Sequence, residues 1–271
     1  MRFRFVELIV IIIFDMSMSL DNKIILITGA TSGFGKATAE LLAKEGYKLI
    51  LVARNNENLE KLKSELKTEV LISSVDVTDK KEVKELFDNL PSKFKDIDVL
   101  INNAGLALGL DVAPETNIED WDTMVDTNIK GLMYFTRFVL DNMKIRNSGL
   151  IISIGSVASS VPYKGGNVYG ATKAFVKQFS RNLRTDLLGT DIKITNIEPG
   201  MAETNFSNVR FKGDVEKAKK VYENSRALKP EDIANTIKWI INQPLRVNID
   251  NIEIMPIDQT FGGMVINRTE K

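Results

Sequence analysis

From residue 23 onward, short apolar runs alternate with longer segments of helical periodicity. The apolar runs lie at residues 23–28, 48–53, 71–75, 99–102, 150–154, 192–197 and 249–255. The helical segments lie at 36–45, 56–66, 80–90, 121–145 and 168–188, and a further helix begins at Pro230. Continuous apolar runs are typical of parallel strands buried on both faces. Their alternation with helices predicts an α/β fold: a single doubly wound parallel sheet of about seven strands with helices on both faces.

Residues 1–20 form a leader that precedes this pattern. It contains two arginines and an apolar run at residues 8–14, far shorter than the roughly 20 residues that cross a bilayer. Met16 and Met18 follow directly, so we expect translation to begin at one of them and the leader to be a mis-assigned start or a disordered tail. A weak membrane anchor is the alternative. Residues 21–271 suit one large domain, since no linker or repeat divides them.

The charges of the chain balance, because 36 basic and 36 acidic side chains give a formal net charge of zero. Nucleic-acid-binding proteins usually carry a basic excess, so the sequence argues against that class of partner. The chain contains no cysteine and no histidine, which excludes disulfides, thiol nucleophiles and Ser-His-Asp catalysis. The commonest transition-metal ligand is also missing, and we expect no metal site. Acid–base chemistry must then use Tyr, Lys, Asp or Glu.

Tyr169 and Lys173 are four residues apart within a helical segment. This spacing puts both side chains on one face of the helix. A cation near a phenol favours the phenolate, so we expect Lys173 to lower the pKa of Tyr169 toward neutrality. Such a pair makes a proton-transfer group suited to pH 7. The alternative is a surface tyrosine beside a solvated lysine.

A glycine-rich turn, Gly29 to Gly35, lies between the first apolar run and its helix. Glycines there allow a tight turn and close approach of the backbone to a pyrophosphate, while the helix N-terminus supplies free N–H groups. The spacing Gly-x-x-x-Gly-x-Gly differs from the commonest dinucleotide pattern, Gly-x-Gly-x-x-Gly. It predicts a dinucleotide site, and a plain strand–helix turn is the alternative.

Arg54 ends the second apolar run, where NAD-binding sheets usually carry an acidic residue for the ribose hydroxyl. Arginine suits a 2′-phosphate by its charge and its paired donors. The sequence therefore predicts NADP(H) rather than NAD(H). The alternative for Arg54 is a solvated surface side chain.

Four ordered motifs resemble those of the short-chain dehydrogenase/reductase family: Thr28-Gly-x-x-x-Gly-x-Gly35, Asn102-Asn-Ala-Gly105, Ser156 with Tyr169-x-x-x-Lys173, and Pro199-Gly200. The match runs from about Lys23 to the C-terminus. Asn128 lies in the long helix where such enzymes carry a catalytic asparagine. The resemblance implies a Rossmann-type sheet and a single NADP-binding catalytic domain at residues 21–271.

The resemblance also implies the roles of individual residues. Tyr169 would exchange a proton with the substrate oxygen, and Lys173 would stabilise the phenolate and bind the nicotinamide ribose. Ser156 would donate a hydrogen bond to the developing oxyanion. Asn128 would hold a water in the proton relay, or else simply bond helix backbone. The implied cofactor contacts are Gly29, Thr31, Ser32, Gly33, Phe34, Gly35, Arg54, Asp76, Val77, Asn103, Ala104, Gly105, Tyr169, Lys173, Pro199, Gly200 and Thr204.

Two stretches, residues 155–175 and residues 196–200 with 206–211, resemble the subgroup of NADP-dependent 3-hydroxy acid dehydrogenases, which oxidise serine and similar acids and reduce malonic semialdehyde. Residues 201–205 depart from that subgroup, because they form a shorter segment than its glycine-containing version. Many NADP-dependent members carry a basic residue in the glycine turn, where this chain has Ser32, so phosphate recognition rests on Arg54. A 3-hydroxy acid needs a cation for its carboxylate. We expect Arg210 to supply it, together with Ser156 and Tyr169 at the reacting oxygen; a structural ion pair is the alternative for Arg210.

Other functions stay open at this point. One is an NADPH-dependent reductase of neutral carbonyl compounds, since one scaffold serves many substrates. Others are a non-catalytic dinucleotide-binding protein and, if the leader is real, a membrane-anchored lipid or steroid reductase. Residues 212–226 are charged and helix-prone and form either a lid or a solvated helix. We expect a cytoplasmic homodimer or homotetramer; Met124, Met133, Phe135 and Phe138 supply more apolar surface than a singly covered helix needs.

Overall fold

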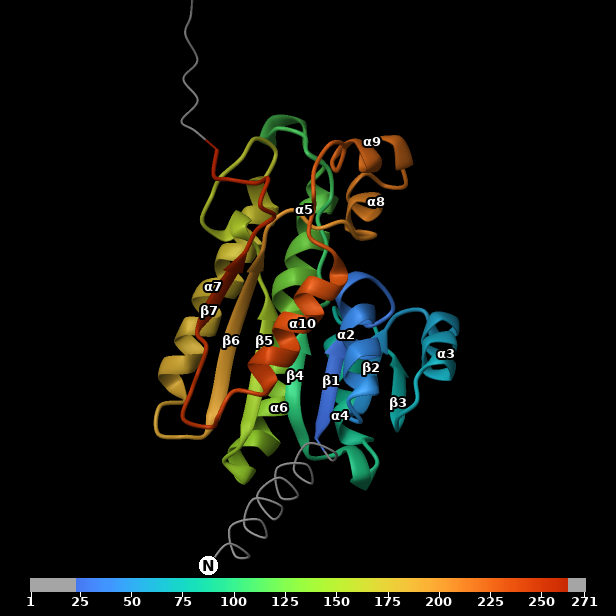
Figure 1. Ribbon diagram of the computed structural model, residues 1–271, viewed down its shortest axis with the longest axis vertical. Helices are drawn as coiled ribbons and strands as arrows, with labels where there is room; N and C mark the ends of the chain where they lie inside the picture. The colour runs from blue at the N-terminus through green and yellow to red at the C-terminus, as the bar shows by residue number, and fades with distance from the viewer. Residues whose placement is uncertain (1–22, 263–271) are drawn as a thin grey trace, which may run out of the picture.

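The computed structural model describes residues 23–262, so the leader at residues 1–20 lies outside the described residues. Seven parallel strands form one sheet in the order β3-β2-β1-β4-β5-β6-β7 (Figure 1). The strands are β1 Ile24–Thr28, β2 Lys48–Ala53, β3 Val70–Ser74, β4 Ile97–Asn102, β5 Gly149–Ile154, β6 Ile192–Pro199 and β7 Asn251–Ile254. The predicted doubly wound sheet is confirmed.

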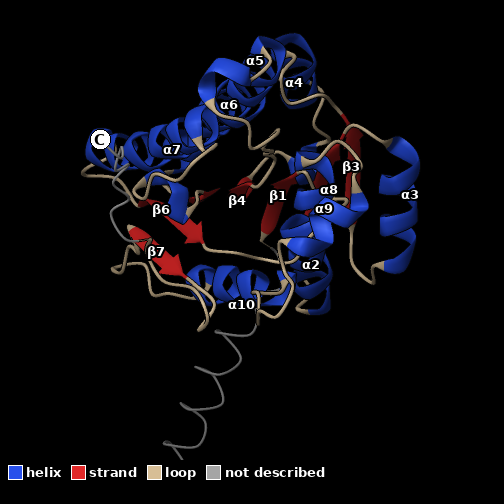
Figure 2. Ribbon diagram, turned by 90° about the horizontal axis from the view of Figure 1, so that it is seen from above, coloured by secondary structure: helices blue, strands red, loops and turns tan. Residues whose placement is uncertain are grey.

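Helices cover both faces of the sheet (Figure 2). The helices are α2 Gly33–Lys44, α3 Asn56–Glu65, α4 Lys80–Asp88, α5 Ile118–Val125, α6 Leu132–Arg146, α7 Asn167–Asp186, α8 Phe206–Arg210, α9 Val215–Lys220 and α10 Pro230–Ile241. Short 3-10 turns lie at Ser92–Phe94, Ala113–Glu115 and Val157–Ser159. One layer contains α2, α3 and α10, and the other contains α4, α6 and α7.

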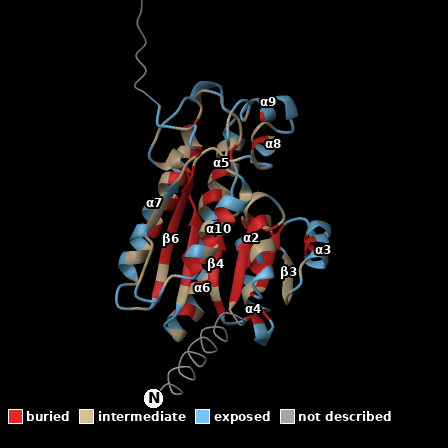
Figure 3. Ribbon diagram, in the orientation of Figure 1, coloured by how far each residue is buried: buried red, intermediate tan, exposed pale blue. Residues whose placement is uncertain are grey.

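The strands are apolar on both faces because each face packs on a helical layer. Ile25 and Ile27 of β1 belong to the core beneath α2 and α10, whereas Ile24 and Leu26 belong to the core beneath α4 and α6. The four side chains are almost fully buried, as is most of the sheet in Figure 3. This two-sided burial explains why the sequence shows runs and not alternation.

The segment predicted as one helix at residues 121–145 is interrupted, so that prediction was wrong in detail. A π-helical turn, Asp126–Gly131, joins α5 to α6. A Cβ atom at Gly131 would lie 2.8 Å from Cγ2 of Val77, so glycine lets the helix approach the loop after β3. The hydrophobic periodicity of the sequence does not reveal the one extra residue of a π-helical turn. π-Helical turns are frequent at functional sites.

The apolar residues expected to form an oligomer surface divide into two groups. Met124 and Phe135 are buried in the chain's own core, and Phe138 packs on Phe87 with ring centroids 5.6 Å apart. Met133 alone of the four is exposed, at 38%. The expectation of excess apolar surface was therefore wrong for most of them, since the neighbouring α4 covers the helix.

The charged segment at residues 212–226 contains α9 and lies beside α8 above the sheet (Figure 1). Lys212 Nζ lies 2.8 Å from Asp120 Oδ2, which links the segment to α5. Val221 and Tyr222 line the large cavity described below, so this segment covers the site and is more than a solvated helix. None of the helices between residues 23 and 262 combines the length and apolar character needed to cross a bilayer.

Candidate active site

A cavity of about 680 Å³ lies at the carboxyl edge of the sheet. Its walls come from the segments that follow β1 to β7, around the point between β1 and β4 where the strand order reverses. Ligands of doubly wound sheets bind at this place. All the site residues predicted from the sequence line the cavity except Gly35 and Asn128.

The glycine turn forms the floor of the cavity. Gly29 has a φ of +64°, a left-handed conformation that glycine adopts without steric cost. A Cβ at Gly35 would lie 2.4 Å from the Gly29 carbonyl oxygen, so only glycine fits behind the turn. Ser32 precedes α2 and makes no side-chain cap. The helix N-terminus therefore presents its backbone N–H groups to the cavity.

Asn103 fixes the glycine turn to the end of β4. Its Nδ2 atom donates to the carbonyl oxygens of Thr28 at 2.9 Å and Gly29 at 3.1 Å. In return, the Thr28 hydroxyl oxygen accepts from the backbone N–H groups of Asn103 and Ala104. The amide nitrogen of Asn103 is thus engaged in the fold, which leaves its side-chain oxygen for a ligand.

Arg54 and Asp76 lie at one end of the cavity. Arg54 is exposed at the end of β2, and the Ser74 hydroxyl donates to its carbonyl oxygen at 2.9 Å. Asp76 Oδ1 accepts from the backbone and the hydroxyl of Thr78 at 2.9 and 2.8 Å, which fixes the loop containing Val77. Arg54 is therefore an exposed residue that also lines the cavity.

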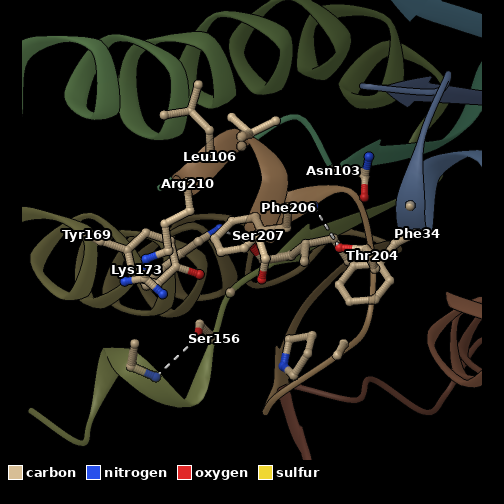
Figure 4. A pocket seen from close by; sticks show the side chains of 18 of the residues that line it. Phe34, Asn103, Leu106, Ser156, Tyr169, Lys173, Thr204, Phe206, Ser207 and Arg210 are labelled. Carbon is tan, nitrogen blue, oxygen red and sulfur yellow. Dashed lines mark hydrogen bonds between the residues drawn. The ribbon is translucent and has the colours of Figure 1, made fainter. Parts of the chain in front are cut away.

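Tyr169 and Lys173 lie one turn apart on α7, and both are buried, at 9% and 6% exposure. Lys173 Nζ lies 5.9 Å from the centroid of the Tyr169 ring and donates to the Ile154 carbonyl oxygen at 2.7 Å. This bond fixes the ammonium group of Lys173 between α7 and the end of β5. Figure 4 shows both residues beside Arg210, with Phe34 and Thr204 at the far end of the cavity.

Burial has opposite effects on the two groups. It raises the pKa of Tyr169 to about 12, although the Ser156 hydroxyl and the Arg210 guanidinium act in the other direction. It lowers the pKa of Lys173 to about 8. The pKa of Tyr169 is thus raised, where the sequence predicted that it would be lowered, because loss of water outweighs the hydrogen bond from Ser156 and the charge of Arg210.

Ser156 follows β5 and precedes the 3-10 turn Val157–Ser159. Its hydroxyl oxygen accepts from the backbone N–H of Ala158 at 3.1 Å, which leaves the hydroxyl hydrogen to donate into the cavity. Gly155 N donates to the Ile197 carbonyl oxygen at 2.6 Å, so β6 supports the start of the turn.

Asn128 lies in the π-helical turn and is 2% exposed. Its Oδ1 accepts from Leu106 N, and its Nδ2 donates to Leu106 O, both at 2.8 Å. The second Nδ2 hydrogen bonds the Thr172 hydroxyl at 3.1 Å. The side chain therefore joins the loop after β4 to α7. It does not line the cavity, and it makes no hydrogen bond to the backbone of its own helix. These hydrogen bonds occupy the Asn128 amide, so a relay water would have to bind other atoms nearby. The role of Asn128 in a proton relay stays a prediction.

Arg210 lines the cavity on the side of Tyr169, away from Phe34 and Thr204 (Figure 4). Its guanidinium carbon lies 5.5 Å from the centroid of the Tyr169 ring. Nε donates to the Gly109 carbonyl oxygen at 3.1 Å, and Nη2 donates to the Tyr163 hydroxyl at 2.6 Å. Arg210 therefore lies beside Tyr169, where neutral partners hold its charge, and its contact with a substrate carboxylate stays a prediction.

Comparison with known proteins identifies the family. The model of the short chain dehydrogenase family matches residues 23–214. The chain belongs to this family. The resemblance inferred from the four sequence motifs is thereby confirmed.

Relatives and solved structures agree with this assignment. The NADP-dependent 3-hydroxy acid dehydrogenase YdfG of Salmonella typhi is 54% identical over 91% of this chain and 100% of its own length. The serine 3-dehydrogenase of Rhizobium radiobacter is 48% identical over 90% of this chain and 98% of its own. The closed form of a serine dehydrogenase complexed with NADP+ superposes with a TM-score of 0.90 and 51% identity, covering 91% of this chain and all of that one.

Two residues of this short-chain dehydrogenase were missed from the sequence. Tyr163 lines the cavity and accepts a hydrogen bond from Arg210. Its position in the chain between Ser156 and Tyr169 was the only feature of the sequence that pointed to it. Gln259, in the segment after β7, also lines the cavity and accepts from Met201 N at 2.7 Å through Oε1. No local pattern marks Gln259, because its contact joins residues 58 positions apart.

Proposed function

We propose that this protein is an NADP-dependent oxidoreductase that interconverts short 3-hydroxy acids, such as L-serine and 3-hydroxypropionate, with their carbonyl forms, such as malonic semialdehyde. The observation that carries this substrate class is the guanidinium of Arg210, 5.5 Å from the Tyr169 ring. A substrate whose hydroxyl meets Tyr169 can place a carboxylate against that cation. The names of the relatives support the same chemistry.

The cavity residues fit a dinucleotide phosphate. The uncapped N-terminus of α2 suits the pyrophosphate of a dinucleotide. Because Gly35 has no side chain, the backbone of α2 packs directly against the Gly29 carbonyl, which keeps the turn compact. Thr204 lies 3.4 Å from the position a Gly33 Cβ would take, and so faces the same turn. Arg54 would bind the 2′-phosphate. The family member in complex with NADP+ supports this assignment.

Bound NADP supplies the hydride acceptor for oxidation or, when reduced, the hydride donor. Tyr169 has a raised pKa and is therefore protonated at pH 7, ready to donate to a carbonyl oxygen in the reduction. In the oxidation, the phenolate form of Tyr169 must form first and then removes the alcohol proton; the hydrogen bond from Ser156 and the positive charge of Arg210 favour that form. Ser156 donates a hydrogen bond to the oxygen as its charge develops, an effect of about 3–4 kcal/mol in comparable sites.

A second function, reduction of neutral carbonyl compounds, is favoured by the apolar wall near Arg210. Leu106, Val161, Phe206 and Val221 line the cavity; Leu106 and Phe206 pack in the cluster that contains Tyr169, and Arg210 lies 6.0 Å from the Phe206 ring centroid. Arg210 also already has two neutral partners. A neutral substrate would contact these apolar side chains and would leave the two hydrogen bonds of the Arg210 guanidinium unchanged.

The Arg210→Met variant distinguishes the two functions. Loss of a charge-assisted contact should raise the KM for L-serine and 3-hydroxypropionate about 10-fold or more. The KM for neutral alcohols should stay the same, and Arg184→Met, on the outer face of α7, serves as the matched control. The assay follows reduced nicotinamide at its absorbance band. An unchanged KM for the hydroxy acids would remove Arg210 from the substrate site and favour the neutral substrates.

We also propose a homodimer or homotetramer in the cytoplasm. Met133, Ile145 and Leu188 are apolar and exposed, at 38%, 84% and 78%. They would be covered in an assembly. Light scattering on the eluting protein tests this, and a monomeric mass at micromolar concentration would refute it.

A further inference from the structure

A buried charge cluster lies behind the catalytic helix, outside the cavity lining. Glu198 of β6 is fully buried, and its Oε2 accepts from Lys177 Nζ at 2.9 Å and from Asn251 Nδ2 at 2.8 Å. Its Oε1 accepts from the Ser159 hydroxyl. Lys177 also donates to the Ser160 hydroxyl at 2.7 Å. The cluster therefore joins α7, β6, β7 and the turn after β5, which neighbour one another in Figure 1.

The cluster is unusual because burying a carboxylate without water is costly. Such a pair persists only when every polar atom finds a partner. Apolar side chains of similar volume are often at least as stabilising, so a buried ion pair is weak as a stability device. Here three of the four contacts involve Lys177, Ser159 or Ser160, which lie on the helix or in the turn that contains the catalytic side chains, so the cluster can fix their geometry.

The spacing connects the cluster to both catalytic groups. Lys177 is one turn after Lys173 and two turns after Tyr169, on the same face of α7. Ser159 and Ser160 end the short turn that begins at Ser156. The start of that turn is fixed by the bond from Gly155 N to β6, and its end is fixed by this cluster. Ser156 is thus held relative to Tyr169 from both sides.

We propose that the Glu198–Lys177 pair is a positioning device that sets the Ser156 hydroxyl against Tyr169. This inference rests on the proposed function, since it assumes that Ser156 donates to the reacting oxygen. Glu198 and Lys177 touch neither cofactor nor substrate; they act through the turn. A shift of about 1 Å in a reacting group can cost roughly 100-fold in rate, so the cluster controls kcat more than ligand affinity.

The sharpest variant is the double change Ser159→Ala with Ser160→Ala. It cuts the turn from the cluster and keeps the contact between Glu198 and Lys177. Because Glu198 Oε1 loses its partner, a thermal unfolding scan first shows that the variant is folded. We expect kcat to fall about 10-fold or more. The Kd for NADP, measured by cofactor fluorescence, should change less than about 2-fold, because its phosphate contacts lie on the β1–β4 side. Glu198→Ala should have a larger effect. In Glu198→Gln the amide oxygen can still accept from Lys177 and Asn251, and the amide nitrogen can donate to the Ser159 hydroxyl, so this variant should retain most of kcat.

A double-mutant cycle shows whether the cluster acts through Ser156. Ser156→Ala alone should lower kcat about 100- to 1000-fold. If the turn variant acts by misplacing that hydroxyl, it should cause no further loss in the Ser156→Ala background. Asp98→Asn is the matched control: it weakens a partly buried ion pair with Arg146 at the opposite edge of the sheet, and kcat should be unchanged.

The outcomes separate the two proposals. A turn variant with wild-type kcat, or with the same loss in both backgrounds, would overturn the positioning role while leaving the proposed function standing. If Ser156→Ala itself keeps full activity, the proposed mechanism fails first. A loss of kcat in Asp98→Asn equal to that in the turn variant would also overturn the inference, because the effect would then follow general destabilisation.

Discussion

Replacing Lys173 with Met should stabilise the cofactor-free protein at pH 7, although it removes a residue of the proposed site. Lys173 is 6% exposed, and burial lowers its pKa from 10.5 to about 8. At 1.36 kcal/mol per pKa unit, holding the ammonium in this position costs the folded protein about 3 kcal/mol. The variant also loses the hydrogen bond to Ile154 O, worth about 1 kcal/mol.

The net expectation is a gain of about 2 kcal/mol, or an increase in Tm of about 4–8 °C for a domain of this size. The pH dependence follows from linkage. Below pH 8 the lysine is protonated in both states, so the full penalty applies. Between pH 8 and 10.5 the unfolded chain binds more protons, so wild-type stability rises with pH relative to the variant. The advantage of the variant should therefore shrink across that window.

The assay is guanidinium unfolding of the cofactor-free protein, followed by tryptophan fluorescence at pH 7.0 and about pH 9.5 at one protein concentration. Dehydrogenase activity should be lost at both values. The reasoning is refuted if Lys173→Met is no more stable than wild type at pH 7. It is equally refuted if the difference between the two proteins does not depend on pH, because a desolvated ammonium must titrate.

Four other changes test the site. Arg54→Ser should raise the Kd for NADP+ about 10- to 100-fold and leave that for NAD+ unchanged in fluorescence titrations. Tyr169→Phe should lower kcat about 100- to 10,000-fold with the Kd for NADP within about 2-fold; retained turnover would contradict the proton-transfer role. Gly35→Ala places a Cβ 2.4 Å from Gly29 O and should destabilise the protein by about 1–3 kcal/mol in thermal unfolding. Gln259→Ala leaves Met201 N without its acceptor and should weaken NADP binding several-fold, an effect absent if this turn does not contact the cofactor.

The local pattern of the sequence determined the scaffold. A strand buried on both faces must be apolar throughout, so the runs at residues such as 48–53 and 150–154 mark the strands directly. In a parallel sheet, the segments after these strands meet at one edge, which is why Gly29, Arg54, Ser156 and Pro199 line one cavity. The spacing of Tyr169 and Lys173 likewise determined that they share a helix face.

The tertiary structure decided how those residues behave. The direction in which the pKa of Tyr169 moves depends on how much water the fold removes, and burial outweighs the hydrogen bond from Ser156 and the charge of Arg210. Asn128 bonds Leu106, and Glu198 bonds Ser159 and Asn251, through contacts between segments far apart in the chain. Local periodicity carries no information about such contacts. They arise only when the helices have packed on the sheet, since packing alone sets which polar groups lose water and which partners replace it.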